Sequence, residues 1–462
     1  MEYLSIKVRR TEVKLKRIVT TVAAAGIVLA GSAYADTASM QKQLDQLQAK
    51  VNAMSNSAGP QTGSRSHAFV NTNSKYTYDM LNNQDSTNRE LTILQHRANG
   101  SVKSNAVYLG GKGELYSDYQ RVGSNNSTKL HLPSANLIFT GTAGKWVTGY
   151  LNLQASNPVT VIGSAQSQTT SSVFLNDAYM VFGNLNASSF YGFGGIKTVD
   201  FGNFYNPNTI MPTLSQAFFE AAGGQVGAGY YKDLTHGNTI NATITALNGG
   251  GTSSYNTMTS NANNINDYAA NATFHGQVTK DMSFHVGGGY INGTGFKSTD
   301  NGRVGAINAN AGVMMGNPIN NIKLNAETTW TTSGVHGLNV GSSFLSNAQN
   351  LYGGEYMIWG QNMSQAQAGT MFSGGGTVKA FNFNAAYTTN LIKYPTVLFA
   401  NYDNVLQNSA NRLYMVSAGG RMEAVHNVWV GASYALAGGK MDSAATDINT
   451  SNTVLADVTA YF

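Results

Sequence analysis

Two histidines, His275 and His285, have the residue type and the spacing to do chemistry together. They lie on either side of residues 279–281, a polar stretch that can form a turn. If these three residues form a hairpin turn, the two imidazoles face each other across adjacent antiparallel strands. Paired imidazoles can titrate near neutral pH or bind a metal ion, but two ligands alone make a weak metal site. We therefore predict a structural or incidental polar contact between the two rings and no metal site.

Acids and bases at alternate positions form a second set of residues that can act on a solute. Both signs are mixed and no ladder of one sign appears, which predicts neither strong anion selectivity nor strong cation selectivity for a pore. A structural alternative is that paired charges simply hold a polar wall together. We predict that this set lines a lumen together with the two histidines, and its members are Lys112, Glu114, Asp118, Asp177, Lys197, Lys323, Glu327, Asp403, Arg421 and Glu423.

Sequence motifs of catalytic sites are absent. The eight histidines form no HExxH pattern, and no Gly-x-Ser-x-Gly elbow occurs. The chain has no cysteine, which excludes disulfides, thiolate metal sites and lipid attachment through cysteine. We therefore predict a protein that is not an enzyme and uses no cofactor. The alternative is a barrel hydrolase whose catalytic residues meet only in space.

Alternation of apolar and polar residues is the pattern that would place the lining residues on one face. In residues 239–247, isoleucine and alanine occupy one face while asparagine and threonine occupy the other. Such alternation over about ten residues predicts a membrane-spanning β-strand. The second segment is weakened by Pro133. We count sixteen segments, centred near residues 112, 134, 150, 178, 193, 228, 242, 271, 286, 309, 325, 383, 399, 417, 431 and 458.

The connections between these segments alternate between short and mostly long. Residues 141–144 and 184–188 are short connections, whereas 156–171, 198–222 and 332–375 are long ones. Short inner turns and longer outer loops are what an even-stranded barrel requires. We therefore predict an all-β fold, a 16-stranded antiparallel transmembrane β-barrel over 105–462, wide enough for an aqueous channel.

Composition agrees with a barrel and excludes other classes. Only 11% of the residues are charged, against about 25% in typical soluble proteins. Aromatic residues make up 10%, which is too many for a disordered chain. Outside the first 35 residues no apolar run is long enough for a membrane-spanning helix.

The first 35 residues have the features of a signal peptide. A basic stretch precedes an apolar core over residues 18–31, and Ala33-Tyr34-Ala35 predicts cleavage before Asp36. The segment holds six of the 28 basic and two of the 23 acidic residues, so 22 basic and 21 acidic residues remain. The mature chain is therefore almost neutral, and we predict no nucleic-acid partner.

Two segments lie between the signal peptide and the barrel. Residues 36–55 contain apolar side chains at heptad spacing from Met40 to Met54, which predicts a short periplasmic coiled-coil helix that could hold a homotrimer. A lone amphipathic helix resting on another surface is the alternative. Residues 56–104 form a polar linker or partial plug, in which residues 89–97 are expected to be helical. That helix either enters the barrel mouth or leads into the first strand.

The end of the chain predicts how the barrel is assembled. Apolar residues occupy every second position and finish on a terminal aromatic residue, which is similar to the C-terminal signal that the outer-membrane assembly machinery reads. The predicted signal consists of Val454, Ala456, Val458, Ala460 and Phe462.

The third long loop is unusually aromatic for a loop exposed to solvent. If it folds inward as in general porins, it brings aromatic rings and two acids towards a solute path, where they suit an amphipathic organic solute. The alternative is a loop whose aromatic rings pin it against the wall. The predicted constriction residues are Asp200, Phe201, Phe204, Tyr205, Phe218, Phe219 and Glu220. The long loop 332–375 is either a lid or a contact to a neighbouring subunit.

The order of segments resembles a known family. A signal peptide, the Gln- and Leu-rich heptad stretch from Met40 to Met54, a polar linker and sixteen strands ending in Phe462 resemble the LbtU-type siderophore porins of gammaproteobacteria such as Legionella. The resemblance is architectural, so no binding residue is transferred from it. It implies uptake of an iron-siderophore across the bacterial outer membrane without the TonB motor. The mature chain is also too short for a plug domain and the 22 strands of a TonB-dependent receptor.

Three functions remain open at the level of sequence. The first is a porin for a ferric siderophore or another small organic solute. The second is a general diffusion porin, and the third is a surface-exposed barrel whose loops bind host or other partners. The expected partners are membrane lipid, a small-molecule solute, the assembly machinery and further copies of the chain.

Overall fold

A computed structural model defines the fold over most of the predicted barrel. It describes residues 70–82, 87–122, 124–131, 134–156, 172–209, 211, 213–248, 265–296, 298, 303–337, 372–408, 411–441 and 446–462. The predicted signal peptide (1–35), the predicted coiled coil (36–55) and most of the loop 332–375 lie outside these residues and stay predictions.

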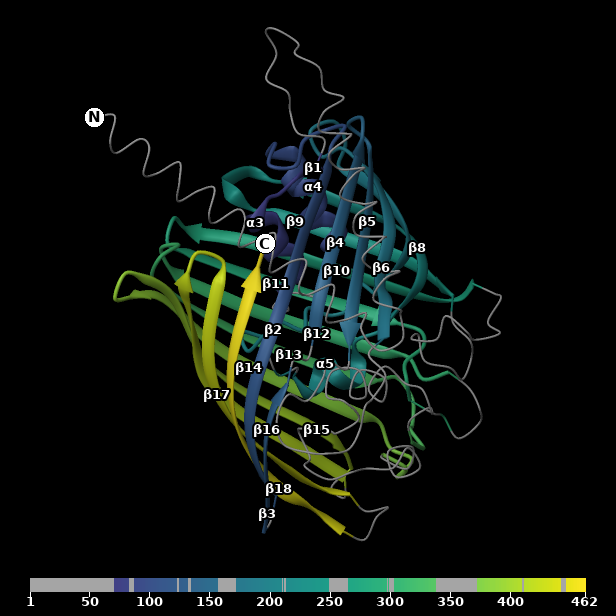
Figure 1. Cartoon of the computed structure of the whole chain (residues 1–462). Coiled ribbons are helices and arrows are strands. Elements are labelled where there is room, and N and C mark those ends of the chain that lie inside the picture. The colour runs from purple at the N-terminus through teal and green to yellow at the C-terminus, as the bar shows by residue number, and fades with distance from the viewer. Residues whose placement is uncertain are drawn as a thin grey trace, which may run out of the picture.

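Sixteen antiparallel strand positions close into one barrel (Figure 1). Each predicted segment centre falls within a strand, so the predicted fold class is confirmed. The strands are β2 (Val107–Val122), β3 (Asn125–His131), β4 (Ser134–Ala143), β5 (Val147–Ser156), β6 (Ser172–Gly183), β7 (Phe190–Thr198), β8 (Ala222–Asp233), β9 (Thr239–Asn248), β10 (Ile265–Thr279), β11 (Met282–Ile291), β12 (Ala306–Gly316), β13 (Asn321–Thr331), β14 (Val378–Leu391), β15 (Tyr394–Gln407), β16 (Asn411–Val425), β17 (Val428–Met441) and β18 (Thr446–Tyr461).

The second strand position is divided between β3 and β4. Both pair with the long strand β2: β4 pairs with Val107–Gly113 and β3 with Tyr116–Val122. Pro133 lies between them and cannot donate a ladder hydrogen bond. The weak segment predicted there is therefore one strand position that is interrupted, and β18 closes the barrel on the other side of β2.

The two faces of the wall differ in polarity as a membrane requires. Large apolar side chains are exposed on the outer face, where acyl chains would contact them, and examples are Met180, Phe182, Val226, Ile244, Val286, Phe381, Leu398, Val416, Val454 and Val458. Asparagine, threonine and charged side chains occupy the inner face, because neighbouring side chains of a strand point to opposite faces. Among the described residues, no helix has both the length and the apolar character needed to span a bilayer.

Short turns and both described chain ends lie at one end of the barrel, which we call the short-turn end. The turns between β10 and β11 and between β14 and β15 are two residues long. At this end β1 (Val70–Asn71) pairs with the beginning of β2, and the backbone of Phe462 bonds to Gly111. A short 3-10 helix, η1 (Thr235–Gly237), lies in the turn between β8 and β9.

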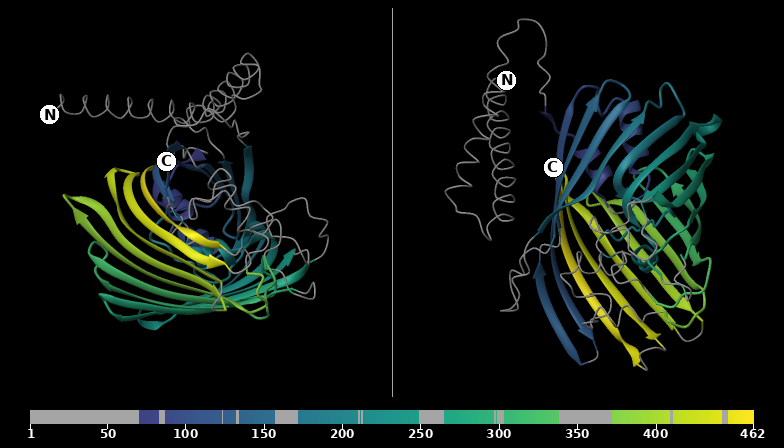
Figure 2. Two further views of the ribbon diagram at one scale, coloured as in Figure 1. Left: turned by 90° about the horizontal axis from the view of Figure 1, so that it is seen from below. Right: turned by 90° about the vertical axis from the view of Figure 1, so that its right-hand side faces the viewer.

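Two helices of the N-terminal segment pack against the inner wall. They are α3 (Ser74–Leu81) and α4 (Arg89–Ala98), and both lie within the curve of the strands in Figure 2. The helix expected over residues 89–97 is therefore present. Its apolar side chains Ile93 and Leu94 are buried in one cluster with lumenal tyrosines of the wall. The Tyr76 hydroxyl of α3 and the Thr140 hydroxyl of β4 are 2.8 Å apart.

A prediction for barrel closure comes from two neighbouring glycines of β2. A Cβ atom at Gly111 would lie 2.2 Å from the ring of Phe462, whereas one at Gly113 would have no atom within 4 Å. We expect Gly111→Val to displace the terminal ring and to destabilise the folded barrel by about 1–3 kcal/mol through overpacking. Gly113→Val, the matched control, should fold normally. The folded fraction is measured by heat-modifiable mobility on gels, and equal yields of the two variants would contradict this account.

Candidate functional site in the barrel lumen

The predicted lining residues all lie on the inner face of the barrel. Their positions alternate with those of exposed apolar residues on the same strands, as Glu114 does with Leu115. They differ in exposure: His275 is exposed, and Lys323 and Glu423 are half-buried. The other members are buried, and they are Lys112, Glu114, Asp118, Asp177, Lys197, His285, Glu327, Asp403 and Arg421.

Several buried charges of the wall pair with neighbouring side chains. The Lys112 ammonium lies 2.9 Å from the Glu114 carboxylate on the same strand. The Arg421 guanidinium lies 3.6 Å from Asp457 on β18. The side-chain amide of Asn382 donates to Asp403 at 2.5 Å. These contacts correspond to the structural alternative, in which paired charges hold the wall together.

The loop between β7 and β8, residues 199–221, which we call L3, folds into the lumen. Its helix α5 (Leu214–Phe219) packs against β13, β14 and β15 on the far wall (Figure 1). At the tip, the backbone N–H groups of Asn203 and Phe204 both donate to the Glu327 carboxylate at 2.9 Å. Asn308 also donates to this carboxylate, at 2.6 Å. Glu327 is therefore the main polar anchor of the L3 tip.

Amide side chains of the far wall anchor the next part of L3. Asn384 donates its amide to the backbone carbonyl of Tyr205 at 2.8 Å, and Asn401 donates to the side chain of Asn206 at 3.0 Å. The Lys323 ammonium lies 3.5 Å from the centre of the Tyr205 ring, a cation–π contact. The guanidinium of Arg421 bonds to the Thr209 hydroxyl. L3 is thus held across the lumen by many separate contacts.

The aromatic side chains of L3 are packed inside the protein. Phe201 and Phe204 are 1% exposed, Phe218 and Phe219 are 2% exposed, and Tyr205 is 5% exposed. Phe218 stacks on Phe296 from the loop after β11, and Phe219 packs against the same ring at a tilt of 53°. The rings therefore fix the position of L3, as in the alternative of a pinned loop. They do not present open faces to a solute.

A buried charge cluster joins α4 to the base of L3. The ammonium of Lys197 lies 2.9 Å from the Glu90 carboxylate of α4 and 2.7 Å from that of Asp200. The backbone N–H of Asn88 also donates to Asp200 at 3.0 Å. All three charged side chains are almost completely buried. One ammonium therefore lies between two carboxylates from segments that are far apart in the sequence.

The two carboxyl groups of this cluster differ in proton affinity. Burial and the neighbouring Asp200 raise the pKa of Glu90 to about 8. Burial alone would also raise the pKa of Asp200, but Lys197 and the hydrogen bonds from its neighbours lower it. Glu90 therefore carries the proton of the pair over the neutral range.

Further contacts hold α4 to the wall of β5 and β6. Arg89 donates to the buried Asp177 carboxylate at 3.3 Å, and Arg97 donates to the Thr148 hydroxyl at 2.6 Å. Arg97 also donates to the backbone carbonyl of Gly144 at 2.7 Å. The sequence predicts a helix over residues 89–97 but does not place Arg89, Glu90 or Arg97 in the lumen. The pattern that could have indicated this placement is a helix with charged side chains at both ends within an otherwise polar segment.

The two histidines face each other as the sequence predicts. His275 and His285 are register partners on β10 and β11, and their ring centroids lie 5.6 Å apart. The side-chain amide nitrogen of Asn203, at the L3 tip, lies 3.4 Å from Nε2 of His285. Among the described residues, no group of three or more histidine, cysteine, aspartate or glutamate side chains is placed to hold a metal ion.

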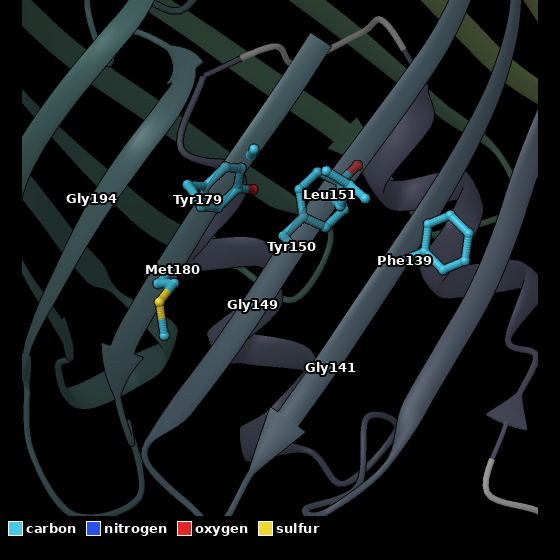
Figure 3. A pocket seen from close by; sticks show the side chains of 9 residues that line it. Phe139, Gly141, Gly149, Tyr150, Leu151, Tyr179, Met180 and Gly194 are labelled. Carbon is cyan, nitrogen blue, oxygen red and sulfur yellow. The ribbon is translucent and has the colours of Figure 1, made fainter. Parts of the chain in front are cut away.

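A hollow of about 440 Å³ lies on the outer wall over β4–β7 (Figure 3). Glycines such as Gly141, Gly149 and Gly194 form its floor, and Phe139 and Met180 contribute apolar side chains. These residues alternate with the lumenal residues of their strands, two of which, Tyr150 and Tyr179, also border the hollow. The hollow therefore faces lipid and is not part of a solute path.

Comparisons with known proteins find similarity in three-dimensional structure but not in sequence families. No protein-family model and no curated protein matches the sequence. The outer membrane channel DcaP of Acinetobacter baumannii is similar with 14% identity over 77% of this chain and 97% of that chain, at a TM-score of 0.48. The anion-selective porin from Comamonas acidovorans gives 9% identity, 77% and 99% coverage and a TM-score of 0.49. Pseudomonas putida OprB gives 7% identity, 77% and 93% coverage and a TM-score of 0.49.

The structure itself assigns the environment of the barrel. A closed sheet leaves no edge with backbone groups that need hydrogen-bond partners, which is a requirement for strands inside a bilayer. The apolar outer face and the polar inner face are arranged for contact with lipid outside and water within. The chain is a sixteen-stranded antiparallel β-barrel that spans a membrane.

Proposed function

We propose that this barrel is a passive channel of the bacterial outer membrane that takes up a small organic solute, a ferric siderophore, without TonB coupling. The observation that carries the channel proposal is a change in exposure along the inner wall. His275, on the part of the wall towards the short-turn end, is exposed. Glu327 and Asp403, which lie beneath L3, are 5% and 0% exposed. A lumen that narrows at an anchored loop suits a solute that binds loosely and then diffuses through.

The lining of the lumen supports an organic solute over a bare ion. Neutral amides from several strands make up much of the inner wall, where they bond to the wall acids, to L3 or to one another, and examples are Asn271, Asn308, Asn310, Asn325, Asn382 and Asn384. The buried charges of both signs described above are engaged with one another or with L3. A largely neutral wall whose charges are paired offers no ladder of one sign, so it does not select a solute by its charge.

The choice of a ferric siderophore rests on the resemblance to LbtU-type porins. Sixteen strands in place of 22 agree with transport that needs no TonB motor. Assembly into a homotrimer through residues 40–54 rests on heptad spacing alone. The C-terminal assembly signal rests on the alternation of residues 454–462, of which Val454 and Val458 are exposed on the outer face.

The test is single-channel recording of the purified mature protein in a planar bilayer. We expect steady current that is blocked by a ferric hydroxamate or ferric carboxylate chelate at submillimolar concentration. The iron-free chelator at the same concentration is the control and should block less, because it differs in shape and charge. A current indifferent to every ferric chelate would identify a general diffusion porin. A barrel that conducts no current would favour a surface protein whose loops bind partners.

A further inference from the structure

We propose that His275, His285 and Asn203 form a binding site for a divalent metal ion in the lumen, where the tip of L3 meets β10 and β11. The ion belongs to the class that prefers imidazole ligands, namely Cu²⁺, Ni²⁺ or Zn²⁺. The sequence alone predicts no metal site at the two histidines, and Asn203, which the folding of L3 brings to them, adds the ligand that the pair lacks. This site does not depend on which solute the channel carries.

The two imidazoles have the separation that a shared ion requires. Their ring centroids lie 5.6 Å apart on directly paired residues of two neighbouring strands. Two imidazoles bound through nitrogen to one tetrahedral ion, with metal–nitrogen distances of about 2.1 Å, have centroids roughly 5 Å apart. The rings can therefore reach a common ion by side-chain rotation, without movement of the strands.

Asn203 supplies a third ligand position at a matching distance. Its side-chain amide nitrogen lies 3.4 Å from Nε2 of His285. Two ligand atoms on one tetrahedral ion with bonds of about 2.1 Å are separated by about 3.4 Å. A half-turn of the amide places its carbonyl oxygen, which can bind a metal, where the nitrogen now lies. The site would then have two nitrogen ligands and one oxygen ligand, and water can complete it.

The surroundings hold these ligands in place and leave a route for the ion. The Glu327 carboxylate accepts the backbone N–H of Asn203 at 2.9 Å, which fixes the L3 tip and adds negative charge near the ion. A Cβ atom at Gly312 would lie 2.3 Å from the ring of His285, so glycine leaves room for this ring against β12. His275 is exposed and can capture an ion from the lumen.

Copper binding to the full mature protein in detergent tests this site. Cu²⁺ alone is titrated and its ligands are identified by electron paramagnetic resonance. We expect one tight ion per chain with nitrogen ligands. His275→Gln and His285→Gln should each weaken binding roughly tenfold or more, and Asn203→Leu should weaken it less. The matched control is His426→Gln. The side chain of His426 is 84% exposed and lies in the turn between β16 and β17, away from the proposed site. It should leave binding unchanged.

Two results would overturn the proposal. One is a native spectrum that shows only oxygen ligands. The other is tight nitrogen-ligated copper that persists in both histidine variants. If His285→Gln does not fold, His275→Gln decides the outcome, because this exposed side chain can be replaced with little effect on packing.

Discussion

Lys197→Met is expected to release α4 from the base of L3. The substitution removes the ammonium between Glu90 and Asp200 and leaves two buried carboxyl groups without it. Breaking a buried ion pair by removing one partner typically costs about 3–5 kcal/mol, which shifts the docked-to-released ratio more than a hundredfold. We expect faster proteolysis within residues 70–104 and a larger channel current, because α4 no longer occupies the lumen.

Two further variants separate this effect from a general loss of stability. Lys232→Met removes an exposed lysine at the end of β8 and should change neither proteolysis nor current. Asp200→Asn combined with Lys197→Met removes the carboxylate that is left charged without its ammonium and should restore part of the protection. If Lys197→Met gave the same current and the same cleavage pattern as the native chain, the cluster of Glu90, Lys197 and Asp200 would not hold α4.

The same cluster predicts how docking depends on pH. The pKa of docked Glu90 is raised from 4.5 to about 8 by burial and by Asp200, so the docked state holds this proton more tightly than the released state. Its contribution to docking is full below about pH 4.5 and declines as the pH rises towards 8. The lowered pKa of Asp200 has the opposite effect and weakens docking only in strong acid. Native protein should therefore be cleaved faster within residues 70–104 at pH 9 than at pH 6, and Glu90→Gln should reduce the difference.

Glu327→Ala is expected to free the tip of L3 and widen the lumen. The carboxylate accepts two backbone N–H groups of L3, at Asn203 and Phe204, and the side-chain amide of Asn308. Hydrogen bonds to a charged group contribute about 1.5–3 kcal/mol each, so their combined loss is large for a loop. We expect larger and noisier single-channel currents and faster entry of larger sugars into proteoliposomes.

A second acid on the inner face provides the control for Glu327. Glu423 on β16 accepts the backbone N–H of Asn427 at 2.7 Å in the two-residue turn before β17, at the short-turn end of the barrel. Glu423→Gln should therefore leave the size limit for sugars unchanged. Glu327→Gln keeps one acceptor oxygen and should give an intermediate effect. If Glu327→Ala and Glu423→Gln admitted the same sugars at the same rates, L3 would not set the size limit.

The amino-acid sequence alone determined the wall of the barrel. Alternation with a period of two is a local property, and a membrane-spanning strand must follow it because one face meets lipid and the other meets water. The sequence could therefore predict all sixteen strand positions and the interruption at Pro133. It could also predict which charged residues lie on the inner face. The sequence also predicts that His275 and His285 face each other. The predicted turn has three residues, whereas the observed turn has two, and an irregularity in the pairing between Gln277 and Thr279 restores the same register.

Only the tertiary structure decided what fills the lumen. The aromatic content of L3 fits both a loop that lines a solute path and a loop pinned to the wall, and the burial of Phe201 and Phe218 favours the second. The position of Glu90 beside Lys197 could not be predicted from the sequence either, because a polar helix can enter a barrel or precede its first strand. These contacts join residues about a hundred or more positions apart, as between Asn203 and Glu327. They follow no period, so only the closed barrel, by bringing distant segments into one lumen, determines which charges meet and which rings are buried.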